Sequence, residues 1–450
     1  MIGIVGGGLS GLFLLHALRR RDMDAVLLEA DHEVGGVARS VASGERMLDL
    51  GPQRFRASPE LLRVLGEVGL SSELVPTAAD LPLLIWRKGR LRAAPHSWLT
   101  GLTTDLLSWR GKLRVPLELL GGPPGDEETV ADFLRRRLGE EAYLALAGPL
   151  LGGLYASQPE RMLARHSLAP ILRQGGENGR MARSLVQTLL RVSGGGQAGA
   201  YGLERGMGSL ANALKTAHDS RVRVGCRVET LQPSVQGGYR LEGPWGTLRV
   251  EQVVLANPAP EASRLLEDLD VAAAAALARL RANPLAVIHL ESGRDLRASG
   301  VKLALDEPGP VRGITANGSL LGRTGLYTAF MGGMGREEVL DAGDAELMAT
   351  AEGEFFRLVG WKARALHLHR TSVPAWDATW AAVEGLRLPT GVHLCTAYHG
   401  RPGIPGRLDE AESLAQRLAS IPRERAAAQE LDGPQPAAGA SASGSHRAGT

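Results

Sequence analysis

The chain has 450 residues, 44% of them hydrophobic, which is enough to bury a large core and to form two or three domains. Its 51 basic and 49 acidic side chains nearly cancel, so the charge gives no reason to expect a nucleic acid partner. Two distant cysteines, Cys226 and Cys395, exclude a disulfide-stapled scaffold and fit a reducing, cytoplasmic location, and no apolar run approaches the ~18 residues that span a bilayer, which leaves only peripheral membrane contact.

The N-terminal residues have the pattern of a strand, a glycine-rich turn, a helix and a second strand. Apolar runs at 2–5 and 25–28 predict the two strands, and residues 12–19 between them predict the helix. This order is a βαβ opening, the first unit of a Rossmann-type domain with a parallel sheet.

The rest of the chain predicts a helical insertion and a second sheet. From about residue 59 to 205, apolar side chains recur at spacings of three and four, which predicts a mainly helical block. Strand-like runs resume at 221–231 and recur as far as 365–369, and residues 408–418 predict a closing helix. The segment 421–450 is rich in Ala, Ser, Gly and Pro, so we expect a disordered tail. Together these elements predict an α/β fold.

The glycine-rich turn carries a dinucleotide-binding fingerprint. Its sequence is Gly6-Gly7-Gly8-Leu9-Ser10-Gly11, a G-x-G-x-x-G that directly follows a strand and opens a helix, as this motif requires. Glu29 ends the second strand, where a carboxylate can accept hydrogen bonds from an adenosine ribose and would repel a 2′-phosphate. The motif therefore favours FAD or NAD over NADP.

The residues after Glu29 favour FAD over NAD. Ala30 leads into Gly35-Gly36-Val37 and then Arg39, which resembles the second FAD segment of the flavin amine oxidase superfamily. A glycine pair lets the backbone run close to a pyrophosphate, and a cation beside it offsets the phosphate charge. We therefore expect FAD as the cofactor.

Further segments resemble the protoporphyrinogen oxidase family. Residues 49–55, Asp-Leu-Gly-Pro-Gln-Arg-Phe, are similar to the family's loop beneath the flavin ring, and residues 129–139 with 149–156 are similar to its helical-domain segment. Residues 201–210 resemble the stretch that re-enters the FAD domain, and Val228 falls where the family's backbone meets adenine. The likeness extends from residue 1 to about 418.

The resemblance implies a function and a set of FAD contacts. The expected reaction is FAD-dependent oxidation of protoporphyrinogen IX or coproporphyrinogen III to the porphyrin in haem biosynthesis, with hydride transfer to flavin and oxygen as acceptor. The flavin carries this chemistry, so no catalytic side chain is required. The expected FAD-binding residues are Gly6, Gly7, Gly8, Leu9, Ser10, Gly11, Glu29, Ala30, Gly35, Gly36, Val37, Arg39, Gly51, Pro52, Gln53, Arg54, Val228, Pro402, Gly403 and Ile404.

The resemblance also implies how the domains divide the chain. We expect a discontinuous Rossmann-type FAD-binding domain built from residues 1–75, 203–265 and 370–420. A helical domain over 76–202 and a mixed-sheet, substrate-binding domain over 266–369 would complete the fold.

Three departures from the family leave rival functions open. Thr396-Ala397 stands where the family usually has Gly-Asp or Gly-Asn, Leu368-His369-Arg370 fills the place of an aromatic residue, and Leu83 falls near a basic substrate-facing position. The rivals are another flavin oxidase or desaturase acting on a different apolar or amine substrate, and a catalytically silent relative that binds porphyrin or a partner protein.

The sequence offers fewer candidate contacts for the substrate than for FAD. Arg54, in the flavin loop, is the expected contact for a substrate carboxylate, with Arg56 and Arg87 as alternatives. His367 and His369 share one face of a predicted strand, which could suggest a metal pair, but no third ligand lies near them in sequence. We therefore favour a half-buried structural pair and expect no metal.

Overall fold

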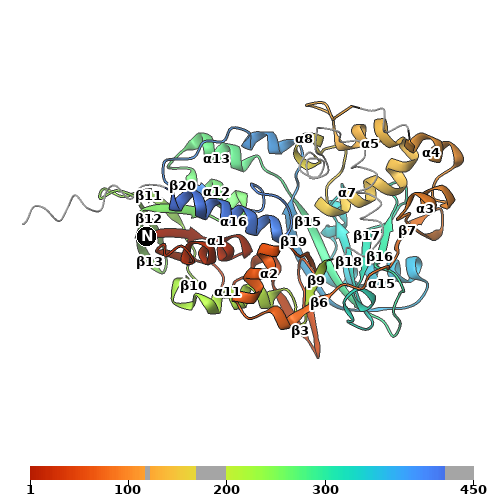
Figure 1. Ribbon diagram of the computed structural model, residues 1–450, viewed down its shortest axis with the longest axis horizontal. Helices are drawn as coiled ribbons and strands as arrows, with labels where there is room; N and C mark the ends of the chain where they lie inside the picture. The colour runs from red at the N-terminus through yellow and green to blue at the C-terminus, as the bar shows by residue number, and fades with distance from the viewer. Residues whose placement is uncertain (117–121, 169–198, 421–450) are drawn as a thin grey trace, which may run out of the picture.

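The computed structural model describes residues 1–116, 122–168 and 199–420 of the chain. The tail predicted at 421–450 lies outside these residues, as does part of the predicted helical block. Among the described helices, none is both long and apolar enough to cross a membrane. Figure 1 shows a parallel-sheet region around the N-terminus, a larger sheet at the opposite end and a group of helices beside that larger sheet.

A five-stranded parallel sheet forms the centre of the N-terminal region. Its strands, in spatial order, are β10 (Val222–Arg223), β2 (Ala25–Leu28), β1 (Ile2–Val5), β14 (Gln252–Leu255) and β20 (Val392–Leu394). Every residue of β1 and β2 is buried, because layers cover both faces and the strands are continuous apolar runs. The predicted βαβ opening is confirmed, with α1 (Leu9–Arg19) between the two strands.

Each face of the parallel sheet packs against a separate layer. On one face, α1 shares a core with α2 (Pro59–Glu67), α11 (Gly208–Ala217) and α16 (Ile404–Ala419). On the other face, the core is completed by a layer of strands and helices. That layer contains β11 (Thr230–Pro233), β12 (Tyr239–Gly243), β13 (Gly246–Val250), α12 (Ala259–Leu266) and α13 (Val271–Ala278).

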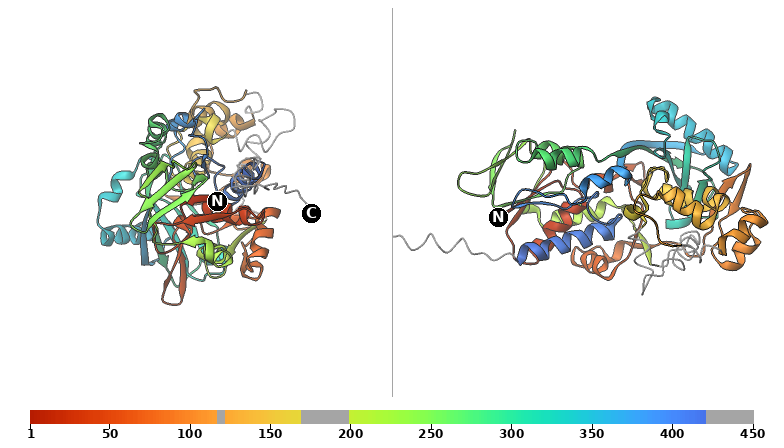
Figure 2. Two further views of the ribbon diagram at one scale, coloured as in Figure 1. Left: turned by 90° about the vertical axis from the view of Figure 1, so that its left-hand side faces the viewer. Right: turned by 90° about the horizontal axis from the view of Figure 1, so that it is seen from above.

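A seven-stranded mixed sheet forms the second region. Its spatial order is β19 (Arg364–Pro374), β15 (Ala282–Glu291), β18 (Leu326–Gly332), β17 (Val311–Ala316), β16 (Gly300–Leu303), β7 (Leu83–Arg87) and β8 (Arg90–Ala93). Helix α15 (Asp344–Val359) packs on one face, where alternate residues of the strands form a shared core. Figure 2 shows α15 and the helical group on opposite sides of this sheet.

The helical group lies over the face that α15 leaves uncovered. Its helix α7 packs against β16 and β17. The group comprises α3 (Trp98–Thr103), α4 (Trp109–Arg114), α5 (Val130–Leu138), α6 (Glu140–Ala142), the π-helical turn η4 (Tyr143–Ala147), α7 (Gly148–Tyr155) and α8 (Ala164–Ser167).

Short elements connect these parts. They are β3 (Ser40–Ser43), β4 (Arg46–Asp49), β5 (Phe55–Arg56), β6 (Leu74–Pro76), β9 (Ala200–Leu203), α14 (Asn317–Leu321) and the 3₁₀ turns η1 (Gly36–Ala38), η2 (Ser71–Glu73), η5 (Asp219–Arg221), η6 (Glu337–Asp341) and η7 (Ala378–Val383). Strand β9 pairs with both β5 and β6, which ties the flavin-loop segment to the residues that re-enter the parallel-sheet region.

Part of the predicted helical block is a β-hairpin. Strands β7 and β8 pair with each other through a two-residue turn, and β7 also pairs with β16 in parallel. Both turn residues, Lys88 and Gly89, have positive φ, the backbone that two-residue hairpin turns require. The apolar run of β7 has only four residues, Leu83 to Trp86, which is too short to separate helix from strand by its period, so the sequence pattern missed it. The domain boundaries stay a prediction.

Candidate active site

The glycine-rich turn joins the carboxyl end of β1 to the start of α1. A Cβ added at Gly11 would lie 2.0 Å from the Gly6 carbonyl oxygen, so only glycine lets the helix pack this closely. A Cβ added at Gly8 would meet no atom within 4 Å, so the Gly8 backbone borders open space. The turn thus leaves room for a phosphate at the N-terminus of α1, where backbone N–H groups and the helix dipole favour an anion.

Glu29 is held at the edge of this turn by two backbone amides. The Gly7 N–H donates to Glu29 Oε2 over 2.5 Å, and the Asp31 N–H donates to Glu29 Oε1 over 2.8 Å. Ala30 lies half-buried between these contacts. The carboxylate is therefore fixed beside the glycine turn, the place that a ribose-binding acid requires.

Replacing Glu29 with arginine is expected to weaken FAD binding by roughly tenfold to a hundredfold, because charge-assisted hydrogen bonds to the ribose are lost. A fluorescence titration of the apoprotein with FAD measures the change. The matched control is Glu33→Arg, since Glu33 is exposed in the same loop. Equal FAD affinity in the two variants would remove Glu29 from the site.

The second glycine pair lies directly against the first turn. The Gly35 N–H donates to the Gly7 carbonyl over 2.8 Å, and a Cβ on Gly36 would lie 3.5 Å from the Gly8 Cα. Arg39 packs against Gly35, and its Nε is buried without a hydrogen-bond partner among the described residues. The other end of the guanidinium forms a long ion pair, with Arg39 Nη1 3.8 Å from Asp31 Oδ2. A buried guanidinium donor that lacks an acceptor fits the charge of a pyrophosphate.

The flavin loop connects the turn to the seven-stranded sheet. Gly51 passes so close to Val37 that an added Cβ would lie 2.0 Å from the Val37 carbonyl oxygen. Two residues later, the buried Gln53 amide donates to Thr328 Oγ1 on β18 over 2.6 Å. Pro52 between them is half-buried. The loop therefore spans the distance from the predicted pyrophosphate site to the sheet.

A buried polar network surrounds the contact of this loop with the sheet. Thr328 Oγ1 accepts hydrogen bonds from Gln53 and from Asn317 Nδ2, the latter over 2.8 Å, and lies 3.1 Å from His289 Nδ1. A hydroxyl that accepts twice donates its own proton to His289 Nδ1, which assigns the neutral Nε2–H tautomer to this histidine. Burial lowers the pKa of His289 to about 4, so the ring is neutral at pH 7.

Acid is expected to destabilise the protein through His289. Histidine in the unfolded chain titrates near pH ~6.5, so between about pH 6.5 and 4 the unfolded state binds more protons and stability falls as the pH falls. The contribution of His289 is at most ~1.4 kcal/mol per pH unit. Melting temperatures at pH 5 and 7.5 should differ less for His289→Asn than for the wild type. The exposed His96 provides the control, since His96→Asn should leave the difference unchanged.

The C-terminal segment lies at the same edge of the parallel sheet as the glycine turn. Cys395 Sγ lies 3.7 Å from the Ser10 carbonyl, so the chain after β20 passes the start of α1. Thr396 is buried and Ala397 is exposed. Pro402 and Gly403 then lead into α16, whose first residue, Ile404, is buried in the core that α16 shares with α1.

Sequence reasoning missed the side chain that fixes this segment. Arg407, on α16, is almost fully buried and donates hydrogen bonds to the carbonyls of Thr396 and Arg401. Burial lowers its pKa to about 10. The burial of Arg407 could have been predicted from its spacing, because it lies three residues after Ile404 and four before Ala411, on the apolar stripe of the helix.

Thr396→Gly combined with Ala397→Asp is expected to tighten FAD binding. One regained hydrogen bond to the cofactor is worth about 0.5–3 kcal/mol, which corresponds to roughly threefold to a hundredfold in affinity. Flavin fluorescence during titration gives the dissociation constant. An unchanged or larger constant would show that residues 396–397 do not contact FAD.

The remaining predicted positions differ in burial and in pairing. Val228 is buried just after β10, and its carbonyl accepts a hydrogen bond from Arg264 Nη2 over 3.2 Å. Arg87 is buried and paired with Asp306 over 2.8 Å, which takes it out of the substrate candidates, and Arg56 is exposed on β5. Arg54 is reached by solvent, yet protein surrounds it closely enough that burial lowers the pKa of its guanidinium.

The two histidines considered as metal ligands lie near the buried network. The His367 ring centroid is 6.4 Å from that of His289, and burial lowers the pKa of His369. No group of three His, Cys, Asp or Glu side chains within the described ranges has the arrangement of a metal site.

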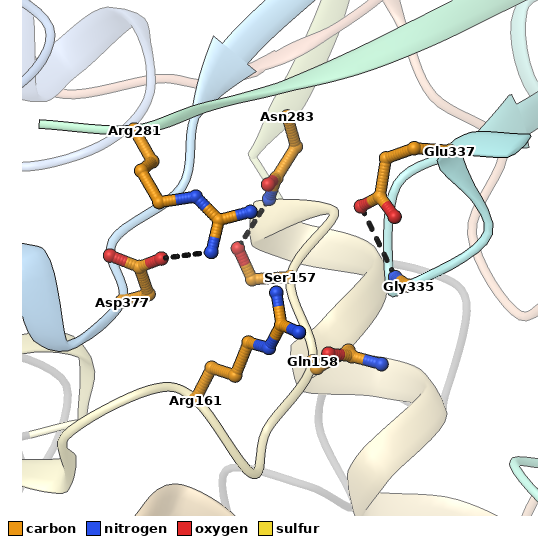
Figure 3. A pocket seen from close by; sticks show the side chains of 8 residues that line it. All are labelled: Ser157, Gln158, Arg161, Arg281, Asn283, Gly335, Glu337 and Asp377. Atoms are coloured by element: carbon orange, nitrogen blue, oxygen red, sulfur yellow. Dashed lines mark hydrogen bonds and ion pairs between the residues drawn. The ribbon is translucent and has the colours of Figure 1, made fainter.

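A small pocket lies where η6 and η7 approach β15 (Figure 3). Its polar side chains pair with one another: Asn283 Nδ2 donates to Ser157 Oγ over 2.6 Å, and Arg281 lies 3.6 Å from Asp377. The cavity volume is about 10 Å³, far below the roughly 300–1,000 Å³ of typical small-molecule sites. We therefore assign this pocket to structure rather than to substrate.

Known proteins place the chain in a family. The family model for flavin containing amine oxidoreductase matches residues 9–407. Protoporphyrinogen oxidase 1, chloroplastic, of Arabidopsis thaliana is 31% identical over 313 residues, covering 64% of this chain and 58% of that protein, less than two thirds of its length. Coproporphyrinogen III oxidase of Mycobacterium leprae (strain TN) is 30% identical over 371 residues, covering 77% of this chain and 81% of that protein.

Solved structures share the fold of this chain. A solved structure from Exiguobacterium sp. 255-15, a proposed protoporphyrinogen oxidase, aligns with a TM-score of 0.75 at 21% identity, over 93% of this chain and 98% of that one. This likeness shows the fold, and the α/β class predicted from the sequence is confirmed. The open turn at Gly8, the fixed Glu29 and the unpartnered Arg39 Nε agree with the predicted cofactor. This chain belongs to the flavin-containing amine oxidoreductase family, as an FAD-dependent oxidoreductase related to the protoporphyrinogen and coproporphyrinogen oxidases.

Proposed function

We propose that the protein oxidises a porphyrinogen, either protoporphyrinogen IX or coproporphyrinogen III, to the porphyrin in haem biosynthesis, with oxygen as the final electron acceptor. The observation that carries the proposal is the 30% identity to a coproporphyrinogen III oxidase over 81% of that protein. The match to a plant protoporphyrinogen oxidase points to the same chemistry.

The residues of this chain perform binding and orientation. When bound, FAD supplies the hydride acceptor. Glu29 and the amides at the start of α1 would hold the adenosine and phosphate end, and Arg39 would add the neutralising cation. The loop with Gln53 would contact the flavin end, and the hydrogen bond from Gln53 to Thr328 fixes this loop against the sheet. Such contacts would align substrate and cofactor without a catalytic acid or base.

Turnover of chemically reduced porphyrinogens tests the proposal. The FAD-loaded protein is mixed with protoporphyrinogen IX or coproporphyrinogen III in air, and porphyrin fluorescence is followed against a heat-treated sample. Enzyme-dependent porphyrin formation from either substrate supports the proposal, and the ratio of kcat/KM values identifies the preferred one. Flavin reduction only by cyclohexylamine or putrescine would instead identify an amine oxidase, and a protein that stays colourless with added FAD would identify a silent relative.

A further inference from the structure

Lys302 occupies an unusual position in the seven-stranded sheet. Its neighbours on β16, Val301 and Leu303, are buried in the core under α15, so Lys302 faces the opposite side, toward α7. A Cβ added at Gly153 of α7 would lie 2.2 Å from Lys302 Nζ. The residue paired with Lys302 on β17 is Gly313, also without a side chain. Two glycines therefore make room for the ammonium group between the helix and the sheet.

The charged side chains that act on Lys302 are themselves positive. Arg54 and Arg312 lie close enough for their charges to act on the ammonium group, and burial with these two charges lowers the pKa of Lys302 to about 8. Within the described residues, neither Lys302 nor Arg54 forms an ion pair or a hydrogen bond with a carboxylate. Arg312 differs, because it donates hydrogen bonds to the carbonyls of Glu307 and Ala304.

Neighbouring cations without an anion are costly in a folded protein. Removing an ammonium group from water is unfavourable unless an opposite charge compensates, and like charges nearby add to the cost. Neither strand beside β16 supplies that charge, since β7 presents Leu83 and Ile85 on the same face. A site that keeps such groups together is therefore built to receive an anion from outside the chain.

We propose that Lys302 and Arg54 together bind a carboxylate substituent of the substrate on the sheet face under α7, with Lys302 as a point charge and Arg54 as a two-pronged donor. Arg54 directly follows Gln53 in the flavin loop, so a carboxylate held there fixes one edge of the substrate close to the cofactor. This assignment rests on the proposed function and makes Lys302 a specificity-determining residue. A porphyrinogen carries such carboxylates as propionates, whereas a simple amine carries none.

Steady-state kinetics with the FAD-loaded protein test the assignment. Lys302→Met keeps the length of the side chain and removes its charge, so KM for the porphyrinogen is expected to rise tenfold to a hundredfold, with kcat changed less than threefold. Lys302→Arg is expected to keep KM within about fivefold of the wild type. Lys362→Met, at an exposed lysine of the same protein, is the control and should leave both constants unchanged. An unchanged KM in Lys302→Met overturns the assignment.

A binding measurement separates this inference from the proposed function. Mesoporphyrin IX and its dimethyl ester differ only in their carboxylates, and quenching of porphyrin fluorescence reports the binding of each. The wild type should prefer the free acid at least tenfold, Lys302→Met should lose that preference, and wild-type affinity should fall above about pH 8 as Lys302 loses its proton. Equal binding of acid and ester by a wild type that oxidises porphyrinogens overturns the inference alone. A wild type that neither binds mesoporphyrin IX nor oxidises a porphyrinogen overturns both.

Discussion

Replacing Gly8 with valine is expected to abolish FAD binding while the polypeptide still folds. The structure gives the reason for both expectations, the loss of FAD binding and the retained fold. A Cβ added at Gly8 meets no protein atom within 4 Å, so we expect the apoprotein to accommodate valine. The same open space borders the N-terminus of α1, where the pyrophosphate must approach the backbone, so valine occupies the phosphate position. We expect a colourless protein whose melting temperature equals that of wild-type apoprotein.

The matched control for this variant is Gly353→Val. Gly353 is exposed on α15, and a Cβ added there also meets nothing within 4 Å. This variant should bind FAD as tightly as the wild type in a fluorescence titration. Substitution of Gly11 is unsuitable for the comparison, because its clash with the Gly6 carbonyl would disturb the helix itself. Full flavin occupancy in purified Gly8→Val would refute the assignment of the turn.

The N-terminal part of the site could be predicted because its signals are local. The strand, the glycine turn and the helix lie within 20 residues, and Glu29 follows at the end of the next strand. Each glycine of this turn has its own structural role, and the spacing of the glycines in the sequence is enough to recognise these roles. The second glycine pair could be recognised for the same reason, since it follows the second strand closely, but its hydrogen bond to Gly7 is seen only in the structure.

The substrate side could not be predicted in this way, because its partners are distant in sequence. Strand β7 pairs with β16, more than 200 residues further along the chain, so its type was decided by tertiary pairing. From the sequence, Arg87 and Arg54 were both candidates to bind a substrate carboxylate. The structure separates them, because Asp306 forms an ion pair with Arg87 and not with Arg54. Lys302 is a single lysine within a short strand, and nothing in the sequence shows that Gly153 and Gly313 leave room for it.

Asp49 joins three parts of the fold at one buried carboxylate. Its side chain is 1% exposed. Oδ1 accepts hydrogen bonds from the Met207 N–H and Ser40 Oγ, each over 2.6 Å, and Oδ2 accepts one from Arg323 Nη1 over 2.8 Å. The carboxylate therefore ties the start of the flavin loop to the segment before α11 and to the end of the seven-stranded sheet.

Replacing Asp49 with alanine is expected to destabilise the protein by about 3–5 kcal/mol, because it leaves the Arg323 charge and the Met207 N–H buried without their acceptor. The melting temperature should fall by roughly 10 °C. Asp49→Asn keeps one acceptor oxygen and should lose less, while Asp268→Ala, at an exposed position after α12, should change little. Because the flavin loop begins at Asp49, we also expect FAD to be released at a lower temperature in Asp49→Ala than in Asp268→Ala. A melting temperature within about 2 °C of the wild type would show that water replaces the lost carboxylate and that this junction does not hold the flavin loop in place.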